Sequence, residues 1–353
     1  MNHRLTGALA VAVLVVATLP GPALGATNDP YFAQQWGLSR IEAEQAWTTS
    51  DGTGALIAVV DSGVDLGHPD LSTKIVANPD ADFVEPNGTC KKEPGKNGGR
   101  TCVQDGAQDR NGHGTHVAGI AAAITGNGVG VAGTAPGARI LPVRVLNADA
   151  EGDTGQVAAG IRYAADKGAD VINLSLGFLT GQGEVLNLIG ELDPVYSAIS
   201  YANAKGSVVV VAAGNDSGPV CAEPAAAPAV LCVGATDNND LRSFYSNGDA
   251  TLMKNYLVAP GGGGLSCAGE IFSTYLRGAE TLCTTQTGYE GASGTSMAAP
   301  FVSGVAALLS AKGLSSTQIV DCIISETDDL GAPGRDPLFG YGRLNAAKAV
   351  AGC

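Results

Sequence analysis

Charged and aromatic residues are scarce in this chain of 353 residues, where they make up only 15% and 5% of the sequence. So few charges argue against a coiled coil or a disordered chain and favour a folded, turn-rich globule. Basic residues are scarcer than acidic ones, 20 against 34, which leaves a net charge of −14. An acidic surface excludes functions that need a basic patch, so we expect no nucleic-acid partner.

The motifs of several enzyme classes are also missing. The sequence contains no His-Glu-x-x-His, which a zinc protease would need, and no Cys-x-x-Cys pair that would indicate a zinc site. Around Ser296 it lacks the Gly-x-Ser-x-Gly pattern in which lipases and esterases hold their nucleophile. These absences exclude the corresponding classes.

Apolar runs are short everywhere except at the start of the chain. The runs 208–213 and 305–309 are far shorter than the ~20 apolar residues that span a bilayer. Residues 1–25 combine a basic Arg4, an uncharged apolar stretch and small residues before the expected cleavage point. This order predicts a secretory signal peptide, with a membrane anchor as the alternative. We expect residues 26–353 to form one domain, secreted to the extracellular space or the periplasm, without membrane contact.

Cysteine is present in an even number. All eight cysteines follow the predicted signal peptide, and an even count in an exported chain predicts disulfides. Eight cysteines allow roughly 100 connectivities, and the sequence does not choose among them. If neighbours along the sequence pair, the bonds are Cys90–Cys102, Cys221–Cys232, Cys267–Cys283 and Cys322–Cys353.

Short apolar, β-branched runs recur along the chain, at 56–60, 140–145, 171–176, 208–211 and 230–233. Continuous apolarity, without alternation, predicts strands that are buried on both faces of a parallel sheet. Ala-rich or helically periodic stretches lie between or after them, at 116–124, 154–167, 194–205 and 296–311. This alternation predicts an α/β fold, a doubly wound and mostly parallel sheet with helices on both faces.

Three polar motifs follow predicted strands or begin predicted helices. They are Val59-Val60-Asp61-Ser62-Gly63, Asn111-Gly112-His113-Gly114-Thr115-His116 and Gly294-Thr295-Ser296-Met297-Ala298. Taken singly, the Asp is explained by a turn, the His by a loop and the Ser by a helix cap. Together they stand in one of the known orders of a catalytic triad, at positions that a doubly wound sheet brings to one crevice.

These motifs closely resemble the three signature motifs of the subtilisin-like serine proteases, the subtilases (peptidase family S8). The resemblance extends from Asn28 to Ala347, and the start and the loop 124–131 look most like the thermitase group. It implies that Ser296 attacks the scissile carbonyl, that His113 moves the proton, and that Asp61 orients the imidazole. It also implies an oxyanion site made of the Asn215 side chain and the Ser296 N–H. From the residues alone, His116 is an alternative base.

The resemblance further assigns residues that bind substrate. The two walls of a pocket for the side chain before the cleaved bond would be Ser175, Leu176 and Gly177, and Ala212, Ala213 and Gly214. An extended peptide would pair with a segment that contains Glu151 and Gly152. Small residues on both walls would leave room for a sizeable apolar side chain, and Asp216 and Glu223, near the rim, would shift the preference towards basic ones.

A structural Ca²⁺ is implied in the same way, and no organic cofactor is expected. Its oxygen ligands would be the side chains of Asp29, Asp70 and Asn127 and the carbonyls of Ile124, Val129 and Val131. Ordinary turn residues without a metal are the alternative.

The segment before the first strand departs from the family pattern. Most subtilases carry a propeptide, but only about 30 residues separate the predicted cleavage point from Leu56, and they already resemble a mature start. We therefore expect no clear propeptide. The sequence as a whole predicts a monomeric, secreted serine endopeptidase that acts on proteins or peptides. A catalytically inactive extracellular binding module on the same fold is the alternative.

Overall fold

The computed structural model describes residues 27–76, 81–84, 89–92, 100–103, 106–177, 192–251 and 255–353, with only the backbone for 89–92 and 100–103. The predicted signal peptide therefore lies outside the described residues. The predicted Cys90–Cys102 bond also rests on side chains outside them, although the backbone register pairs Cys90 with Cys102.

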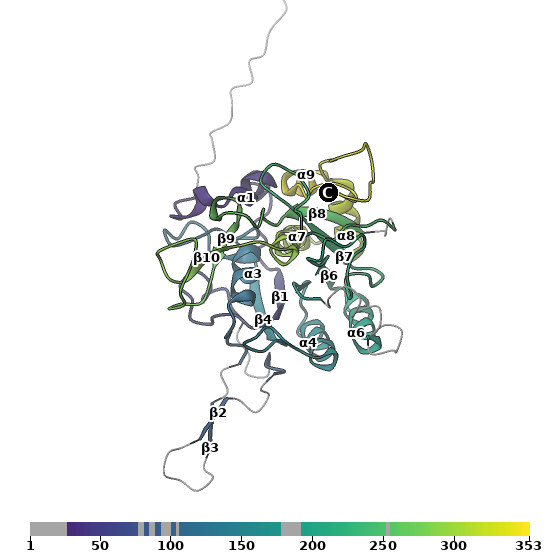
Figure 1. Cartoon of the computed structure of the whole chain (residues 1–353). Coiled ribbons are helices and arrows are strands. Elements are labelled where there is room, and N and C mark those ends of the chain that lie inside the picture. The colour runs from purple at the N-terminus through teal and green to yellow at the C-terminus, as the bar shows by residue number, and fades with distance from the viewer. Residues whose placement is uncertain are drawn as a thin grey trace, which may run out of the picture.

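A six-stranded sheet forms the centre of the molecule, in the order β4-β1-β5-β6-β7-β8 (Figure 1). All neighbouring strands are parallel. The strands are β1 (Leu56–Asp61), β4 (Arg139–Arg144), β5 (Val171–Leu174), β6 (Val208–Ala212), β7 (Leu231–Thr236) and β8 (Tyr256–Pro260). The first five confirm the strands expected from apolar runs. The edge strand β8 was missed; it ends on a proline, which an edge strand tolerates.

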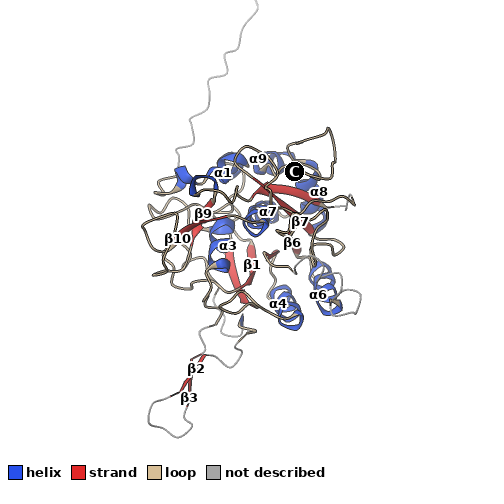
Figure 2. Cartoon of the chain, viewed as in Figure 1, coloured by secondary structure: helices blue, strands red, loops and turns tan. Residues whose placement is uncertain are grey.

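Helices cover both faces of this sheet (Figure 2). They are α1 (Trp36–Arg40), α2 (Ala43–Trp47), α3 (His113–Ala122), α4 (Thr154–Asp166), α6 (Asp193–Ala204), α7 (Thr295–Ser310), α8 (Ser316–Ser325) and α9 (Ala346–Gly352). Ile57 and Val59 of β1 pack in one core with α3 and α7, while Ala58 and Val60 pack in the other with α4 and α6. The alternation of side chains along a strand thus separates the two cores, and the doubly wound fold is confirmed.

Two antiparallel hairpins and two single turns of 3₁₀ helix complete the described elements. The hairpin strands are β2 (Thr89–Lys92) with β3 (Arg100–Val103), and β9 (Ile271–Thr274) with β10 (Tyr289–Ala292). The turns are η1 (Phe32–Gln34) and η3 (Cys267–Gly269). The β9–β10 hairpin packs on α3, where the Ser273 and Thr274 hydroxyls donate to the carbonyls of His116 and Thr115 at 2.8 and 2.7 Å. The hairpin thereby holds the first turn of α3.

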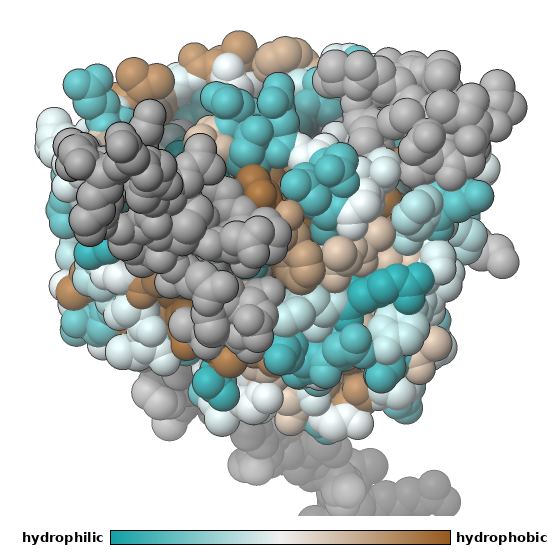
Figure 3. Space-filling view, turned by 90° about the horizontal axis from the view of Figure 1, so that it is seen from below, coloured by the Kyte–Doolittle hydropathy of each residue, from teal (hydrophilic) through white to brown (hydrophobic). Residues whose placement is uncertain are grey.

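Disulfides join Cys221 to Cys232, Cys267 to Cys283 and Cys322 to Cys353. These are three of the four pairs of sequence neighbours that were expected. None of the helices in the described part of the chain is long and apolar enough to cross a membrane. On the face that Figure 3 shows, apolar residues lie near the centre and along the upper rim, interspersed with hydrophilic ones, as is usual for a folded domain.

Candidate active site

The carboxyl edge of the sheet carries the candidate catalytic residues. Asp61 is the last residue of β1, and Ser175 directly follows β5. His113 is the first residue of α3, and Ser296 is the second residue of α7. Parallel strands end at the same edge of a sheet, and the helices that return from this edge begin there. The fold therefore brings residues that are far apart along the chain to one place.

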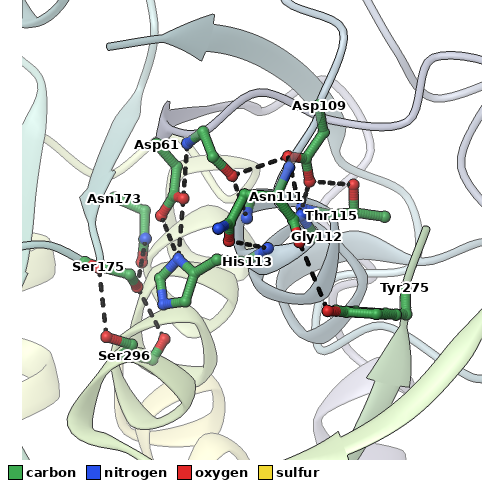
Figure 4. A network of polar contacts seen from close by, with 12 residues as sticks. Asp61, Asp109, Asn111, Gly112, His113, Thr115, Asn173, Ser175, Tyr275 and Ser296 are labelled. Carbon is green, nitrogen blue, oxygen red and sulfur yellow. Dashed lines mark hydrogen bonds and ion pairs between the residues drawn. The ribbon is translucent and has the colours of Figure 1, made fainter. Parts of the chain in front are cut away.

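Asp61 and His113 form a hydrogen-bonded pair (Figure 4). The His113 Nδ1 atom lies 2.8 and 3.0 Å from the two oxygens of the fully buried Asp61 carboxylate. The Ser62 N–H donates to the same carboxylate at 2.7 Å. Burial lowers the pKa of His113, but the charge of Asp61, their hydrogen bond and the charge of Asp109 outweigh it, so the pKa is raised. With Nδ1 bound to Asp61, Nε2 is the basic atom of the neutral ring.

Ser296 and His113 line one groove with a volume of ≈560 Å³. Figure 4 shows Ser296 beneath the imidazole ring. The Ser296 hydroxyl donates to the Ser175 carbonyl at 3.2 Å, so that among the described contacts it is turned to Ser175 and not to His113. Rotation about one single bond exchanges the acceptor, and catalytic hydrogen bonds commonly tighten only with substrate bound.

Pro300 lies inside α7 and makes a helical carbonyl available to another donor. Because proline has no N–H, the Ser296 carbonyl, four residues earlier, cannot receive its usual helical hydrogen bond. The Ser175 hydroxyl donates to this carbonyl at 2.8 Å, and it accepts from the Asn173 amide at 2.9 Å. Ser175 thus contacts Ser296 through both its hydroxyl and its carbonyl, and it fixes the backbone of the candidate nucleophile.

Asn215 lies beside the start of α7. Its Oδ1 accepts hydrogen bonds from the N–H and the hydroxyl of Thr295, both at 2.9 Å. The Nδ2 end of the amide is therefore the donor end, and Asn215 lines a cavity of ≈130 Å³ together with Ser296. The Ser296 N–H belongs to the first turn of α7, where N–H groups have no partner inside the helix. Two N–H donors thus border the same cavity.

This cavity is also lined by four of the expected pocket residues, Leu176, Gly177, Ala212 and Gly214, and by Asp216. Ala213 does not line it, because neighbouring residues of an extended chain point in opposite directions, and Ala213 is fully buried in the α4 and α6 core.

The other expected substrate residues are divided between the groove and the interior. Ser175, Glu151 and Gly152 line the larger groove beside His113. Glu223 is only 9% exposed, and its carboxylate accepts a hydrogen bond from Tyr196 of α6. Its negative charge is therefore bound to a tyrosine, whereas Asp216 is exposed at the cavity.

His116 lies one helical turn beyond His113 but not in the groove. It is 2% exposed, and its Nε2 atom lies 3.1 Å from the Glu290 carbonyl. Burial, opposed by hydrogen bonding to that carbonyl, lowers the pKa of His116 to about 4. The structure thus distinguishes the two histidines of the motif, and only His113 contacts Asp61.

The expected calcium ligands gather where the start of the chain meets the loop after α3. Asp29 accepts from the N–H groups of Gly126 and Asn127 at 2.8 and 3.1 Å, and Asp70 accepts from the Asn127 amide at 2.8 Å. Burial, with the charge of Asp29 adding to it, raises the pKa of Asp70 to about 6, against hydrogen bonds from Val131 and Asn127. Across the described residues, no cluster of three His, Cys, Asp or Glu side chains is placed to hold a metal. The side chains brought together here are two carboxylates and one amide, and with the expected carbonyls of Ile124, Val129 and Val131 they would form an oxygen set that suits Ca²⁺.

Asp109 is a residue of the site that the sequence analysis missed. It is 3% exposed, lies four residues before His113, and accepts hydrogen bonds from the loop that carries this histidine. Sequence spacing alone could suggest it, because Asp readily binds the backbone N–H groups of the next few residues. The sequence carried no signal that this carboxylate is buried.

The regions of this chain that match known proteins include Asp61, His113 and Ser296. The family model described as "Subtilase family" matches residues 52–342. The chain is 42% identical to thermitase of Thermoactinomyces vulgaris over 324 residues, which cover 92% of this chain and 98% of thermitase. It is 34% identical to subtilisin BL of Lederbergia lenta, over 89% of this chain and 98% of that protein. A solved protease structure from Pseudoalteromonas arctica superposes with a TM-score of 0.74 at 31% identity, over 93% of this chain and 99% of the other.

Proposed function

Because this chain belongs to the subtilase family and is a serine endopeptidase of the subtilisin type, we propose that Asp61, His113 and Ser296 are its catalytic triad. The observation that carries the proposal is the hydrogen bond between Asp61 and His113 in a groove that Ser296 also lines. The substrates are proteins or peptides. The enzyme acts as a monomer, without nucleic-acid or membrane partners.

In the proposed mechanism, the Ser296 hydroxyl turns from Ser175 to the Nε2 atom of His113. Its oxygen attacks the scissile carbonyl carbon while its proton passes to Nε2. His113 then gives this proton to the leaving amine as the C–N bond breaks, which leaves an acyl group on Ser296. A water molecule then attacks the acyl carbon while its proton passes to His113. The bond between this carbon and the Ser296 oxygen breaks, the carboxylic acid leaves, and His113 returns the proton to the Ser296 oxygen. Asp61 stabilises the imidazolium in both steps.

The negative oxygen of each tetrahedral intermediate would be held by the Asn215 side-chain amide and the Ser296 N–H. Donors aimed at this position act most strongly on the transition state, because negative charge develops there. Replacement of Asn215 by Ala should lower kcat by a factor on the order of 10²–10³, the effect known for the corresponding donor of a subtilisin, and leave KM nearly unchanged. Steady-state kinetics on one peptide substrate tests this.

The substrate would lie extended along the groove, paired with the segment of Glu151 and Gly152, with one side chain in the cavity between Leu176, Gly177, Ala212 and Gly214. Small residues on both walls admit a sizeable apolar side chain. Asp216 at the same cavity would make basic side chains acceptable too.

We further propose that residues 1–25 direct export and are removed, and that Ca²⁺ binds at Asp29, Asp70 and Asn127. The hydrogen bonds that Asp29 accepts from the Asn127 backbone N–H and Asp70 accepts from the Asn127 side-chain amide support the calcium site. Hard oxygen ligands from two carboxylates would offset the charge of the ion, and the ion would join the start of the chain to the loop after α3.

A digest of a peptide library, together with labelling by a sulfonyl fluoride, tests the proposed function. The wild-type enzyme should cleave peptides and carry the label on Ser296, whereas Ser296→Ala should do neither. Ser310→Ala, at the other end of α7, is the matched control and should keep both properties. If the wild-type chain neither cleaves nor becomes labelled, the proposal is wrong, and the inactive binding module takes its place.

A further inference from the structure

The Asp109 carboxylate is saturated with hydrogen bonds from both sides of His113 (Figure 4). Its Oδ1 accepts from the Ser62 hydroxyl at 2.9 Å and from the N–H groups of Asn111 and Gly112 at 2.9 and 3.0 Å. Its Oδ2 accepts from the N–H and the hydroxyl of Thr115 at 3.0 and 2.6 Å. A carboxylate offers about four lone pairs and no donor, so it suits a place where only donors point inward.

These donors belong to the segment that sets the position of the imidazole. The first N–H groups of a helix have no partner inside it, and α3 begins at His113 itself. Gly112 has φ 106°, and a Cβ atom there would lie 2.4 Å from the Tyr275 ring. The backbone just before His113 therefore packs directly against this ring. Asp109 thus satisfies N–H groups on both sides of a residue whose backbone has little room to move.

Ser62 connects this carboxylate to that of Asp61. The Ser62 hydroxyl donates to Asp109 and accepts from the Gly114 N–H at 3.0 Å, while the Ser62 N–H donates to Asp61. Since Asp61 binds His113 directly, the network closes on the imidazole from two directions. A shift of Asp109 would therefore move both the histidine and the partner that orients it.

We propose that Asp109 is a positioning residue, whose carboxylate fixes the loop around His113 so that the imidazole stays between Asp61 and Ser296. The proposal rests on the proposed triad, and it goes beyond it by adding a second buried carboxylate. Misplacement of a catalytic group by about 1 Å costs up to 10²-fold in rate. Loss of the hydrogen bonds that hold the His113 loop should therefore lower kcat measurably.

Several charged or titratable groups face His113. Asp61 comes from β1, Asp109 from the loop before α3, His116 from α3 itself, Glu151 from the lining of the same groove, and Tyr275 from the position after β9. Only the two aspartates add attraction for the protonated imidazole. Removing the charge of Asp109 should therefore move the acidic limb of kcat/KM to lower pH.

The first experiment compares Asp109→Asn with Asp170→Asn. Asp170 is the matched control, because its partly buried carboxylate also binds a backbone N–H and a serine hydroxyl, those of Leu56 and Ser310. Asp109→Asn should lower kcat about 10- to 100-fold with KM within about twofold. It should also move the acidic limb to lower pH, while Asp170→Asn changes neither. An unmoved limb and an unchanged kcat in folded Asp109→Asn would overturn the proposal.

The second experiment keeps the charge of Asp109 and removes the hydroxyl of Thr115, in case Asp109→Asn does not fold. Thr115→Val deletes the hydroxyl bond to Asp109 and also the bond that this hydroxyl accepts from the Asp65 N–H at 2.9 Å. Thr134→Val deletes an equally buried hydroxyl bond to the Ile120 carbonyl. Only Thr115→Val should lower kcat, and its acidic limb should stay in place. Equal kcat values for the two variants would contradict the proposal.

A third measurement separates this proposal from the proposed function. The His113 ring is titrated by NMR in the inactive Ser296→Ala chain, with and without Asp109→Asn. The titration should move to lower pH in the double variant, whether or not the chain is a protease. A cleaving wild type with an unmoved His113 titration refutes the role of Asp109 alone, whereas a non-cleaving wild type refutes the triad.

Discussion

The Ser296 carbonyl accepts its hydrogen bond from a side chain in place of the usual helical N–H. Pro300 cannot donate to the Ser296 carbonyl, and the Ser175 hydroxyl takes its place at 2.8 Å. Ser175 in turn belongs to a buried chain in which Asn173 accepts from the Ser303 hydroxyl at 2.8 Å. One serine side chain thus links the end of β5 to the start of α7.

Ser175→Ala should leave the partly buried Ser296 carbonyl without this donor and the buried Asn173 amide without this acceptor, at a cost of about 1–3 kcal/mol of unfolding free energy. It should also lower kcat, because the candidate nucleophile loses a contact that fixes its position. Ser207→Ala is the matched control, since the buried Ser207 hydroxyl donates to the Ala169 carbonyl at 2.7 Å, at the opposite edge of the sheet. It should lose similar stability and keep kcat. Urea unfolding and steady-state kinetics on both variants decide the matter.

In the proposed mechanism His113 is the base, so its raised pKa would set the pH dependence of activity. The base must be neutral to accept the Ser296 proton, so kcat/KM should fall as pH drops through this pKa, with the acidic limb above the ordinary histidine value of 6.5. The free energy of unfolding that this histidine contributes should change with pH in the opposite direction to kcat/KM. The ion pair with Asp61 stabilises the fold fully below 6.5, and this part is lost as pH rises through the raised pKa. A limb below 6.5 in a kcat/KM profile would contradict a raised pKa of His113.

At the scale of elements, loops rather than helices or strands form most of the pocket. The segment after β6 carries Gly214, Asn215 and Asp216 and continues to Cys221, which is bonded to Cys232 of β7. The Ala222 N–H donates to the Ala213 carbonyl at 2.8 Å, so this loop returns against its own strand. The disulfide therefore ties one wall of the pocket to the rigid sheet.

Replacement of Cys221 and Cys232 by Ala should lower stability by about 2–4 kcal/mol and broaden the preference for the side chain before the cleaved bond, since the wall becomes able to move. The matched control replaces Cys322 and Cys353, which join α8 to the end of the chain. It should lower stability without a change in preference. Thermal unfolding and the library digest give both readouts, and an unchanged preference in the first pair would count against a role of the bridge in the pocket.

At the scale of the whole molecule, the candidate calcium ligands join three parts of the chain that are distant in sequence. Asp29 lies near the start, Asp70 follows β1, and Asn127 lies in the loop after α3. An ion bound only by the folded chain would stabilise it by about 3 kcal/mol at a free concentration 100 times Kd.

A chelator should therefore lower the unfolding temperature, and added Ca²⁺ should restore it. Asp29→Asn should abolish this difference, while Asp193→Asn, an exposed acid at the start of α6, should preserve it. Calorimetric scans with and without chelator provide the measurement. An unfolding temperature that chelation leaves unchanged in the wild type would exclude a structural calcium at these residues.

Local patterns in the sequence determined the fold class and the candidate triad. Continuous apolar runs marked the first five strands of the sheet, and three short motifs marked Asp61, His113 and Ser296, because strand burial and triad chemistry leave strong local signals. The family resemblance selected His113 over His116, and the tertiary structure supplied the reason, since only His113 contacts Asp61. Only the tertiary structure placed Ala213 in the core, bound Glu223 to Tyr196 and buried Asp109 among the donors of the His113 loop. Each of these outcomes depends on which groups a side chain meets across the fold, and such contacts between distant segments leave no pattern along the chain.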